Sequence, residues 1–182
     1  MWRMALAVVA LGSPAFADCE DLWFSRNAVF DQAGFCFGST LGQSVFDNSD
    51  CTTTSPEISE REKALVARIK AQERNLDCRI DTARSQIEVA DLEQRRGLME
   101  QPVADGFESA CIGWKAAVYD LRLAPFEDAP EATQIRPGDM LLLRHEGTDG
   151  FDFVTVLRDG NVAGLGWMSA PIDETTCSDF AG

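Results

Sequence analysis

Six cysteines constrain the fold of this chain more than any other feature, and all of them follow an apolar N-terminal segment. An even number of cysteines in an exported protein is typical of a disulfide framework, so we expect three bridges. A zinc site is the alternative. It is disfavoured because the chain has no C-x-x-C pair and one histidine, so we expect neither a metal nor a cofactor. The cysteines are Cys19, Cys36, Cys51, Cys78, Cys111 and Cys177.

The N-terminus has the features of a secretory signal peptide. Arg3 supplies a positive charge, residues 4–12 are apolar, and residues 13–17 end in the small-x-small pattern that signal peptidase cleaves. We predict cleavage after Ala17, which removes residues 1–17 and leaves a soluble protein in the periplasm or outside the cell. The apolar run is far shorter than the roughly 20 residues of a spanning helix, so no membrane span is expected.

The chain is strongly acidic. It carries 30 Asp and Glu residues against 16 Lys and Arg residues, a formal net charge of -14. Proteins contact phosphate groups through clusters of Lys and Arg, which this sequence lacks. Binding to nucleic acid or to an anionic lipid surface is therefore disfavoured, and solubility is the simplest explanation of the acidity.

The first half of the chain has helical patterns. Residues 20–33 contain neither Pro nor Gly and carry apolar residues at helical spacing, and residues 39–46 form a shorter element. A third helix is predicted to begin at the capping box of Ser59 and Glu62, and residues 81–107 are expected to form a helical linker. The apolar face of the third helix carries Leu65, Val66, Ile69 and Leu76.

Residues 26–37 resemble the YARHG domain, a small extracellular bacterial module with the pattern R-N-x-I-Y-A-R-H-G-Y-x-F. The resemblance implies a helical domain over residues 18–80. Gln32 and Ala33 replace the family's central Arg and His, so no role of those two side chains carries over. We expect Arg26 and Asn27 to bind backbone carbonyls of the loop and the aromatic residues to fold back over Phe30. The matching positions are Arg26, Asn27, Phe30, Gly34, Phe35 and Phe37.

The second half of the chain has short apolar segments separated by Gly, Pro and Asp, which predicts a small antiparallel barrel. The pair Asp159-Gly160 indicates a tight hairpin. The layout resembles the bacterial SH3-like domain at residues 121–122, 137–139, 151–156 and 164–167. We therefore expect an α+β protein, in which a small helical disulfide-linked domain precedes a small antiparallel SH3-like β-barrel over residues 108–182.

These domain limits bear on the disulfide pairing. Cys111 and Cys177 bracket the expected barrel and are predicted to pair. Cys36 with Cys51 would close a short loop, which leaves Cys19 with Cys78, although the sequence does not decide the connectivity among these four cysteines.

Catalysis is disfavoured by the residues present. His145 is expected in an exposed turn, with no nucleophile near it and no free thiol in the chain. We therefore predict a non-enzymatic binding module of the cell envelope that recognises peptidoglycan through the barrel. The alternative is a protein-protein adaptor or an inhibitor-like partner of an envelope enzyme, and the oligomeric state is left open. The speculative ligand-binding side chains are Tyr119, Phe126, Phe151 and Trp167.

Overall fold

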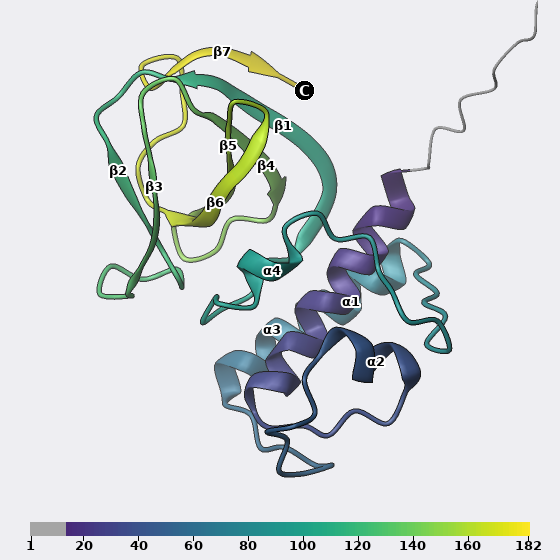
Figure 1. Ribbon diagram of the computed structural model, residues 1–182. Helices are drawn as coiled ribbons and strands as arrows, with labels where there is room; N and C mark the ends of the chain where they lie inside the picture. Colours follow the sequence, from purple (N-terminus) through teal and green to yellow (C-terminus); the bar gives the residue numbers. More distant parts are fainter. Residues whose placement is uncertain (1–13) are drawn as a thin grey trace, which may run out of the picture.

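The computed structural model describes residues 14–182, which form a helical region and a sheet region (Figure 1). The helical region contains α1 (Pro14–Gln32), α2 (Thr40–Val45) and α3 (Glu60–Asn75). The predicted signal peptide lies outside the described residues, apart from the backbone of its last four residues in α1. No helix of the described part of the chain is long and apolar enough to cross a membrane.

The motif at the end of α1 folds back as its aromatic residues predict. Gly34 follows the helix with a φ of 77°, a left-handed conformation that glycine adopts without strain. The amide of Phe35 then donates to the carbonyl of Phe30 at 3.0 Å. The Phe35 ring meets the Phe37 ring edge-on at 4.9 Å, and Phe37 stacks on Phe46 at 4.6 Å. The turn therefore begins an aromatic cluster that joins α1 to α2.

The two polar residues of the motif do not bind the loop. The Nε of Arg26 donates to both carboxylate oxygens of Glu73 on α3, at 2.9 and 3.1 Å. The side-chain amide of Asn27 donates to the carbonyl of Trp23, one turn earlier in its own helix. The prediction that both residues bind loop carbonyls is wrong, because Arg26 faces α3 and Asn27 is buried within α1.

The third helix begins as the sequence predicts. Ser59 accepts a hydrogen bond from the amide of Glu62, and the Glu62 carboxylate accepts one from the amide of Ser59. The helix packs on α1 through Leu65, Val66 and Ile69, which are buried.

Residues 76–103, here called the connecting segment, form no continuous helix. Their one helix is α4 (Leu92–Arg95), so the prediction of a helical linker over residues 81–107 is wrong. Ile87 and Val89 both pack against the aromatic cluster of the helical region. Residues two apart share a side in an extended chain and not in a helix, so burial of both favours the extended form.

Within residues 14–182 the strands form one seven-stranded antiparallel sheet in the order β3-β2-β6-β5-β4-β1-β7. The sheet is open, with β3 and β7 at its edges, whereas the sequence predicts a closed barrel that begins at residue 108. The strands are β1 (Ala104–Trp114), β2 (Tyr119–Arg122), β3 (Glu131–Ile135), β4 (Met140–His145), β5 (Asp152–Arg158), β6 (Asn161–Met168) and β7 (Cys177–Ala181).

Local signals in the sheet region are confirmed. Asp159 and Gly160 both have positive φ, 52° and 76°, and join β5 to β6 as a two-residue hairpin.

The described residues contain three disulfides and no free cysteine. The bonded pairs are those that the domain limits favour, namely Cys19–Cys78, Cys36–Cys51 and Cys111–Cys177.

Candidate functional site

Two of the four aromatic side chains expected to bind a ligand are buried. Phe151 is 7% exposed and Trp167 is 2% exposed, and both pack with Phe153 and Leu98 between the sheet and the connecting segment. The indole Nε1 of Trp167 donates to the carbonyl of Glu100 at 3.1 Å. The prediction that Phe151 and Trp167 contact a ligand is therefore wrong, because the sheet uses them to bury its contact with the connecting segment.

The other two aromatic residues, Tyr119 and Phe126, reach the surface. Tyr119 is half-buried, and its hydroxyl lies 3.3 Å from the Ser169 hydroxyl and accepts a hydrogen bond from the Ser169 amide. Phe126 lies in the loop that joins β2 to β3, where its side chain is 43% exposed. Phe126 is therefore the expected ligand-binding residue that the structure leaves most accessible.

The β2–β3 loop, residues 123–130, is ordered by its own contacts. The amide of Leu123 donates to the carbonyl of Pro130 at 2.9 Å, which closes the loop at its base. The amide of Ala129 donates to the carbonyl of Phe126 at 3.1 Å, and the Ala129 side chain is buried. Surface loops packed in this way hold their side chains in defined positions. The loop therefore presents the Phe126 ring from a fixed support.

A groove of about 330 Å³ lies beside this loop, between the connecting segment and strands β3 and β6. We call it the β3–β6 groove. Apart from Leu165, the residues that line it from the strands are small, which keeps it open. A Cβ at Gly164 would lie 2.6 Å from the Thr133 side chain, so glycine allows β3 to approach β6 closely. The groove is lined by Gly97, Leu123, Ala132, Thr133, Ala163 and Leu165, among others.

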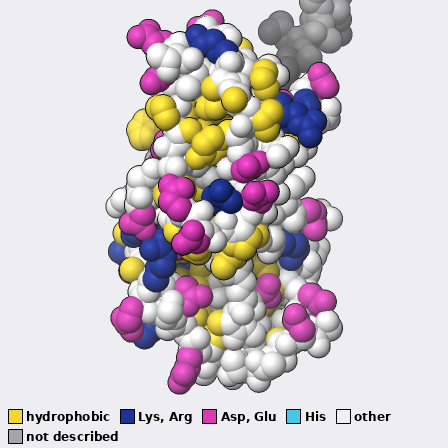
Figure 2. All heavy atoms as spheres, turned by 90° about the vertical axis from the view of Figure 1, so that its left-hand side faces the viewer, with side chains coloured by type: hydrophobic (Ala, Val, Ile, Leu, Met, Phe, Trp, Pro, Cys, Tyr) yellow, Lys and Arg dark blue, Asp and Glu magenta, His cyan; other side chains and the backbone are white. Residues whose placement is uncertain are grey.

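Acidic side chains surround the exposed loop. Glu127 and Asp128 follow Phe126 and are exposed, as is Glu131 at the start of β3. Residues 123–130 contain neither Lys nor Arg, and Arg122, just before them, lies 3.8 Å from the Glu131 carboxylate. Figure 2 faces this side of the molecule and shows hydrophobic side chains gathered over the sheet region, with both acidic and basic side chains around them. The loop itself therefore combines the apolar Phe126 ring with negative charge.

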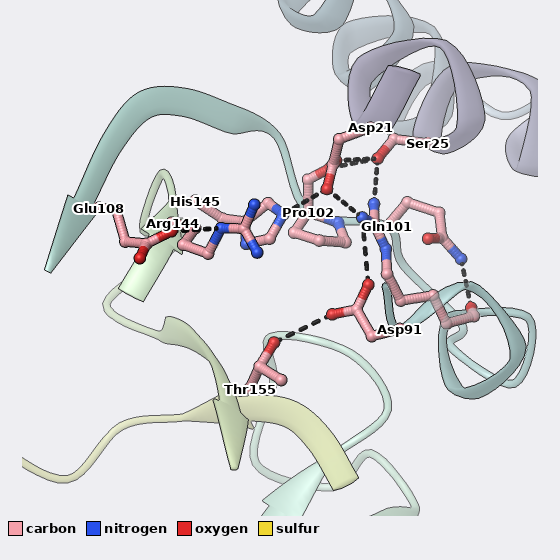
Figure 3. A network of polar contacts seen from close by, with 10 residues as sticks. Asp21, Ser25, Asp91, Gln101, Pro102, Glu108, Arg144, His145 and Thr155 are labelled. Carbon is pink, nitrogen blue, oxygen red and sulfur yellow. Dashed lines mark hydrogen bonds and ion pairs between the residues drawn. The ribbon is translucent and has the colours of Figure 1, made fainter. Parts of the chain in front are cut away.

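A second group of polar residues lies inside the molecule, where the helical region meets the sheet (Figure 3). The side chain of His145, at the end of β4, is 4% exposed, and its Nε2 lies 3.2 Å from a carboxylate oxygen of Asp21 on α1. Its ring meets the Phe153 ring edge-on at 5.0 Å. The prediction of an exposed turn histidine is wrong, because α1 covers this end of β4.

Arg95 of α4 stands at the centre of this network and is fully buried. Its guanidinium pairs with the carboxylate of Asp21, donates to the hydroxyl of Ser25 and lies 3.9 Å from the carboxylate of Asp91. The other Asp91 oxygen accepts a hydrogen bond from Thr155 of β5 at 3.0 Å. One cation of the connecting segment therefore links α1 to the sheet.

The network holds Asp21 in its ionised form. Burial raises the pKa of this carboxyl group, but the charges and hydrogen bonds of Arg95 and His145 lower it more, so its pKa lies well below the usual range. Asp18, one turn earlier, has a raised pKa because of its own burial and the charge of Asp21, which Arg144 partly offsets. Asp21 therefore carries its negative charge at neutral pH despite its surroundings.

The geometry of this network does not match a hydrolytic triad. In such a triad the imidazole stands between the carboxylate and the nucleophilic hydroxyl. Here the Asp21 carboxylate stands between His145 and Ser25, and the buried Ser25 hydroxyl donates to the carbonyl of Pro102 at 2.8 Å. The arrangement connects structural elements and leaves the hydroxyl without a base. Within residues 14–182, no three His, Cys, Asp or Glu side chains are placed to hold a metal ion.

Apart from His145, the members of this network are not predicted from the sequence. The available signal was the spacing of Asp21 and Ser25, which are four residues apart and therefore share a face of α1. Arg95 lies 74 residues from Asp21, and no local pattern connects them. No sequence pattern predicts the β3–β6 groove either, because small residues within strands are common.

The fold, the surface around the β2–β3 loop and the buried network around Arg95 define the class of protein. It is an α+β protein in which a disulfide-linked helical region is joined to an antiparallel sheet through a buried ion-pair network. The family model of the YARHG domain matches residues 10–74, which confirms that resemblance. A family model described as Domain of unknown function (DUF4453) matches residues 77–182, more than half of the chain.

The chain therefore belongs to the DUF4453 family, and it carries a YARHG domain ahead of that match. The boundary between the two matches falls at the end of α3, so the connecting segment belongs with the sheet. No comparison supports the resemblance to an SH3-like domain. No curated protein and no solved structure matches the chain.

Proposed function

We propose that this protein is a non-enzymatic binding module of the bacterial cell envelope, which acts as an adaptor or inhibitor-like partner of another protein. The observation that carries the proposal is the exposed ring of Phe126 on the ordered β2–β3 loop. Aromatic side chains held in place at a surface are frequent anchors of protein interfaces, because they bury a large area and lose little conformational entropy on binding.

Location outside the cytoplasm is supported by the signal-peptide pattern and by the three disulfides, which persist in oxidising compartments. A non-enzymatic role is supported by the burial of the Ser25 and His145 side chains and by the small exposure, 15%, of the Asp21 side chain. A substrate would have to reach these groups through the contact between the helical region and the sheet.

Peptidoglycan is a second candidate partner. Tyr119 and Phe126 both reach the surface of the sheet region, which leaves their rings accessible to this ligand. Under this hypothesis the two rings contact glycan or stem peptide, without help from the buried Trp167.

Site-specific photo-crosslinking tests both candidates. The photoreactive residue p-benzoylphenylalanine replaces Phe126 in the bacterium that produces the protein, and in a matched control it replaces Phe180, which is similarly exposed on β7. We expect an ultraviolet-dependent adduct at position 126 that protease digests, and a much weaker one at position 180. An adduct that muramidase digests would favour peptidoglycan. Equal or absent adducts at the two positions would sink the proposal.

A further inference from the structure

We infer that the β2–β3 loop and the β3–β6 groove form one docking surface for a basic segment of a partner protein, with an apolar side chain in the groove and Lys or Arg side chains against the loop. This inference rests on the proposed function and specifies the chemistry of the partner.

The loop and the groove are continuous. Leu123 lines the groove and also begins the loop. The amide of Met99 donates to the Leu123 carbonyl at 2.9 Å, and the Met99 side chain is 53% exposed. Met99 is therefore held against Leu123 by its backbone, and Phe126 follows Leu123 three residues later in the same loop. Through Leu123 the groove adjoins a loop with an exposed ring, which gives a partner both a hollow to fill and a ring to cover.

The dimensions of the groove favour a side chain over a larger ligand. Its volume of about 330 Å³ is at the small end of the range for binding pockets. Its strand residues, Ala132, Thr133 and Ala163, leave room above the backbone without offering charged groups. One large apolar side chain of a peptide segment fits a hollow of this size and character.

The charge around the groove determines which charge a partner segment must carry. Glu127 and Asp128 are exposed on the loop, which contains neither Lys nor Arg, whereas Glu131 lies 3.8 Å from Arg122 at the end of β2. Glu93 of α4 is exposed next to Gln94, which lines the groove, and lies 3.5 Å from Arg96. The Ser169 hydroxyl donates to the Glu127 carboxylate at 3.1 Å and holds it in position. The acidic groups of the loop, Glu127 and Asp128, favour Lys and Arg in the partner and repel acidic segments.

A library of random 12-residue peptides displayed on phage tests this chemistry. Peptides are selected on the oxidised protein, residues 18–182, and counter-selected on an Ala163→Phe variant, in which a ring fills the groove from an exposed strand position. We expect enrichment of sequences with one large apolar residue flanked by Lys or Arg. Enrichment of neutral or acidic sequences, or no enrichment, would overturn the inference.

A synthetic consensus peptide then gives the contribution of each part. We expect at least a tenfold loss of affinity with Ala163→Phe, a similar loss with Phe126→Ala, and a threefold to tenfold loss with Glu127→Gln combined with Asp128→Asn. The controls Phe180→Ala and Ala117→Phe should leave affinity unchanged, and near-ultraviolet circular dichroism verifies that each variant is folded. Equal affinity for the protein and its Phe126→Ala variant would also overturn the inference.

The outcomes separate this inference from the proposed function. A protein adduct at position 126 in the bacterium, together with an acidic or neutral peptide consensus, would overturn the basic partner and leave the adaptor function supported. A basic consensus that loses affinity with Ala163→Phe supports the docking surface even before the natural partner is known.

Discussion

The sheet region and the helical region complete their hydrophobic cores in different ways. The main core of the sheet is built from residues 111–177 alone and includes the buried Cys111–Cys177 disulfide. The two clusters of the helical region both need residues from outside it. Val103 and Ala104 complete the cluster between α1 and α3, and Ile87 and Val89 cover the aromatic cluster of α1 and α2.

This difference shows that the two family matches are not two independent folding units. Residues 10–74 match the YARHG domain, yet the side chains that cover its hydrophobic faces lie within the DUF4453 match. The contact between the regions is also where the buried charges of Asp21 and Arg95 meet. The helical region therefore depends on the sheet region more than the sheet depends on it.

Separating the regions should give the largest effect. We expect residues 97–182 to fold alone, because their main core is complete, and residues 18–80 to remain unfolded even with both of their disulfides formed. Two-dimensional amide NMR spectra would show dispersed signals for the first fragment and collapsed signals for the second. A dispersed spectrum for residues 18–80 would contradict the comparison.

Replacing the central cation should destabilise the whole chain strongly. In an Arg95→Met variant the carboxylates of Asp21 and Asp91 lose their buried partner, which typically costs about 3 to 5 kcal/mol in the free energy of unfolding. Urea unfolding of the full chain measures the loss. The matched control is Arg79→Met, because Arg79 pairs with Asp77 at the exposed surface and should change stability by no more than about 0.5 kcal/mol.

Removal of one disulfide should affect the helical region selectively. Cys36 and Cys51 close a loop of 15 residues, for which the chain-entropy model gives about 3 kcal/mol. In a Cys36→Ser, Cys51→Ser variant we expect faster amide hydrogen exchange in α1 and α2 and unchanged exchange in β4, β5 and β6. Equal loss of protection in the sheet would mean that the two regions unfold as one cooperative unit.

Features of this architecture that depend on adjacent residues were predicted from the sequence. Features that depend on contacts between distant residues were not. The capping box of Ser59 and Glu62 and the hairpin at Asp159-Gly160 each depend on a few adjacent residues. The disulfide pairs followed from domain limits. The connecting segment was wrongly predicted to be helical. Its extended form is stabilised by the aromatic cluster of α1, which lies far away in sequence and leaves no local signal. His145 and Trp167 were misplaced because α1 and the connecting segment bury them.

Acid should weaken the contact between the regions through Asp21. The folded-state pKa of Asp21 lies below its unfolded value of about 4, so its contribution to stability is present above pH 4 and is lost as the pH falls below it. One such group contributes at most about 1.4 kcal/mol per pH unit to the slope of the unfolding free energy against pH. An Asp21→Asn variant should show a shallower loss of unfolding free energy between about pH 4 and pH 2.

Asp152 provides the control of opposite sign. Burial raises the pKa of its carboxyl group, so its protonation in acid favours the folded state. An Asp152→Asn variant should therefore show an acid slope at least as steep as that of the unmodified protein. A slope as shallow as that of Asp21→Asn would argue that general charge, and not the buried pair, governs acid stability.

Phe126 should show the smallest effect on stability and a large one on binding, which separates the outer surface from the contact between the regions. Its ring is 43% exposed, so Phe126→Ala should lower the unfolding free energy by only about 1 kcal/mol. Trp167→Ala, at a buried position of the same sheet, should cost about 3 to 5 kcal/mol. Thermal or urea unfolding of both variants measures the contrast. If Phe126→Ala were as destabilising as Trp167→Ala, the ring would be serving the fold, and the argument that it is held at the surface for a partner would fail.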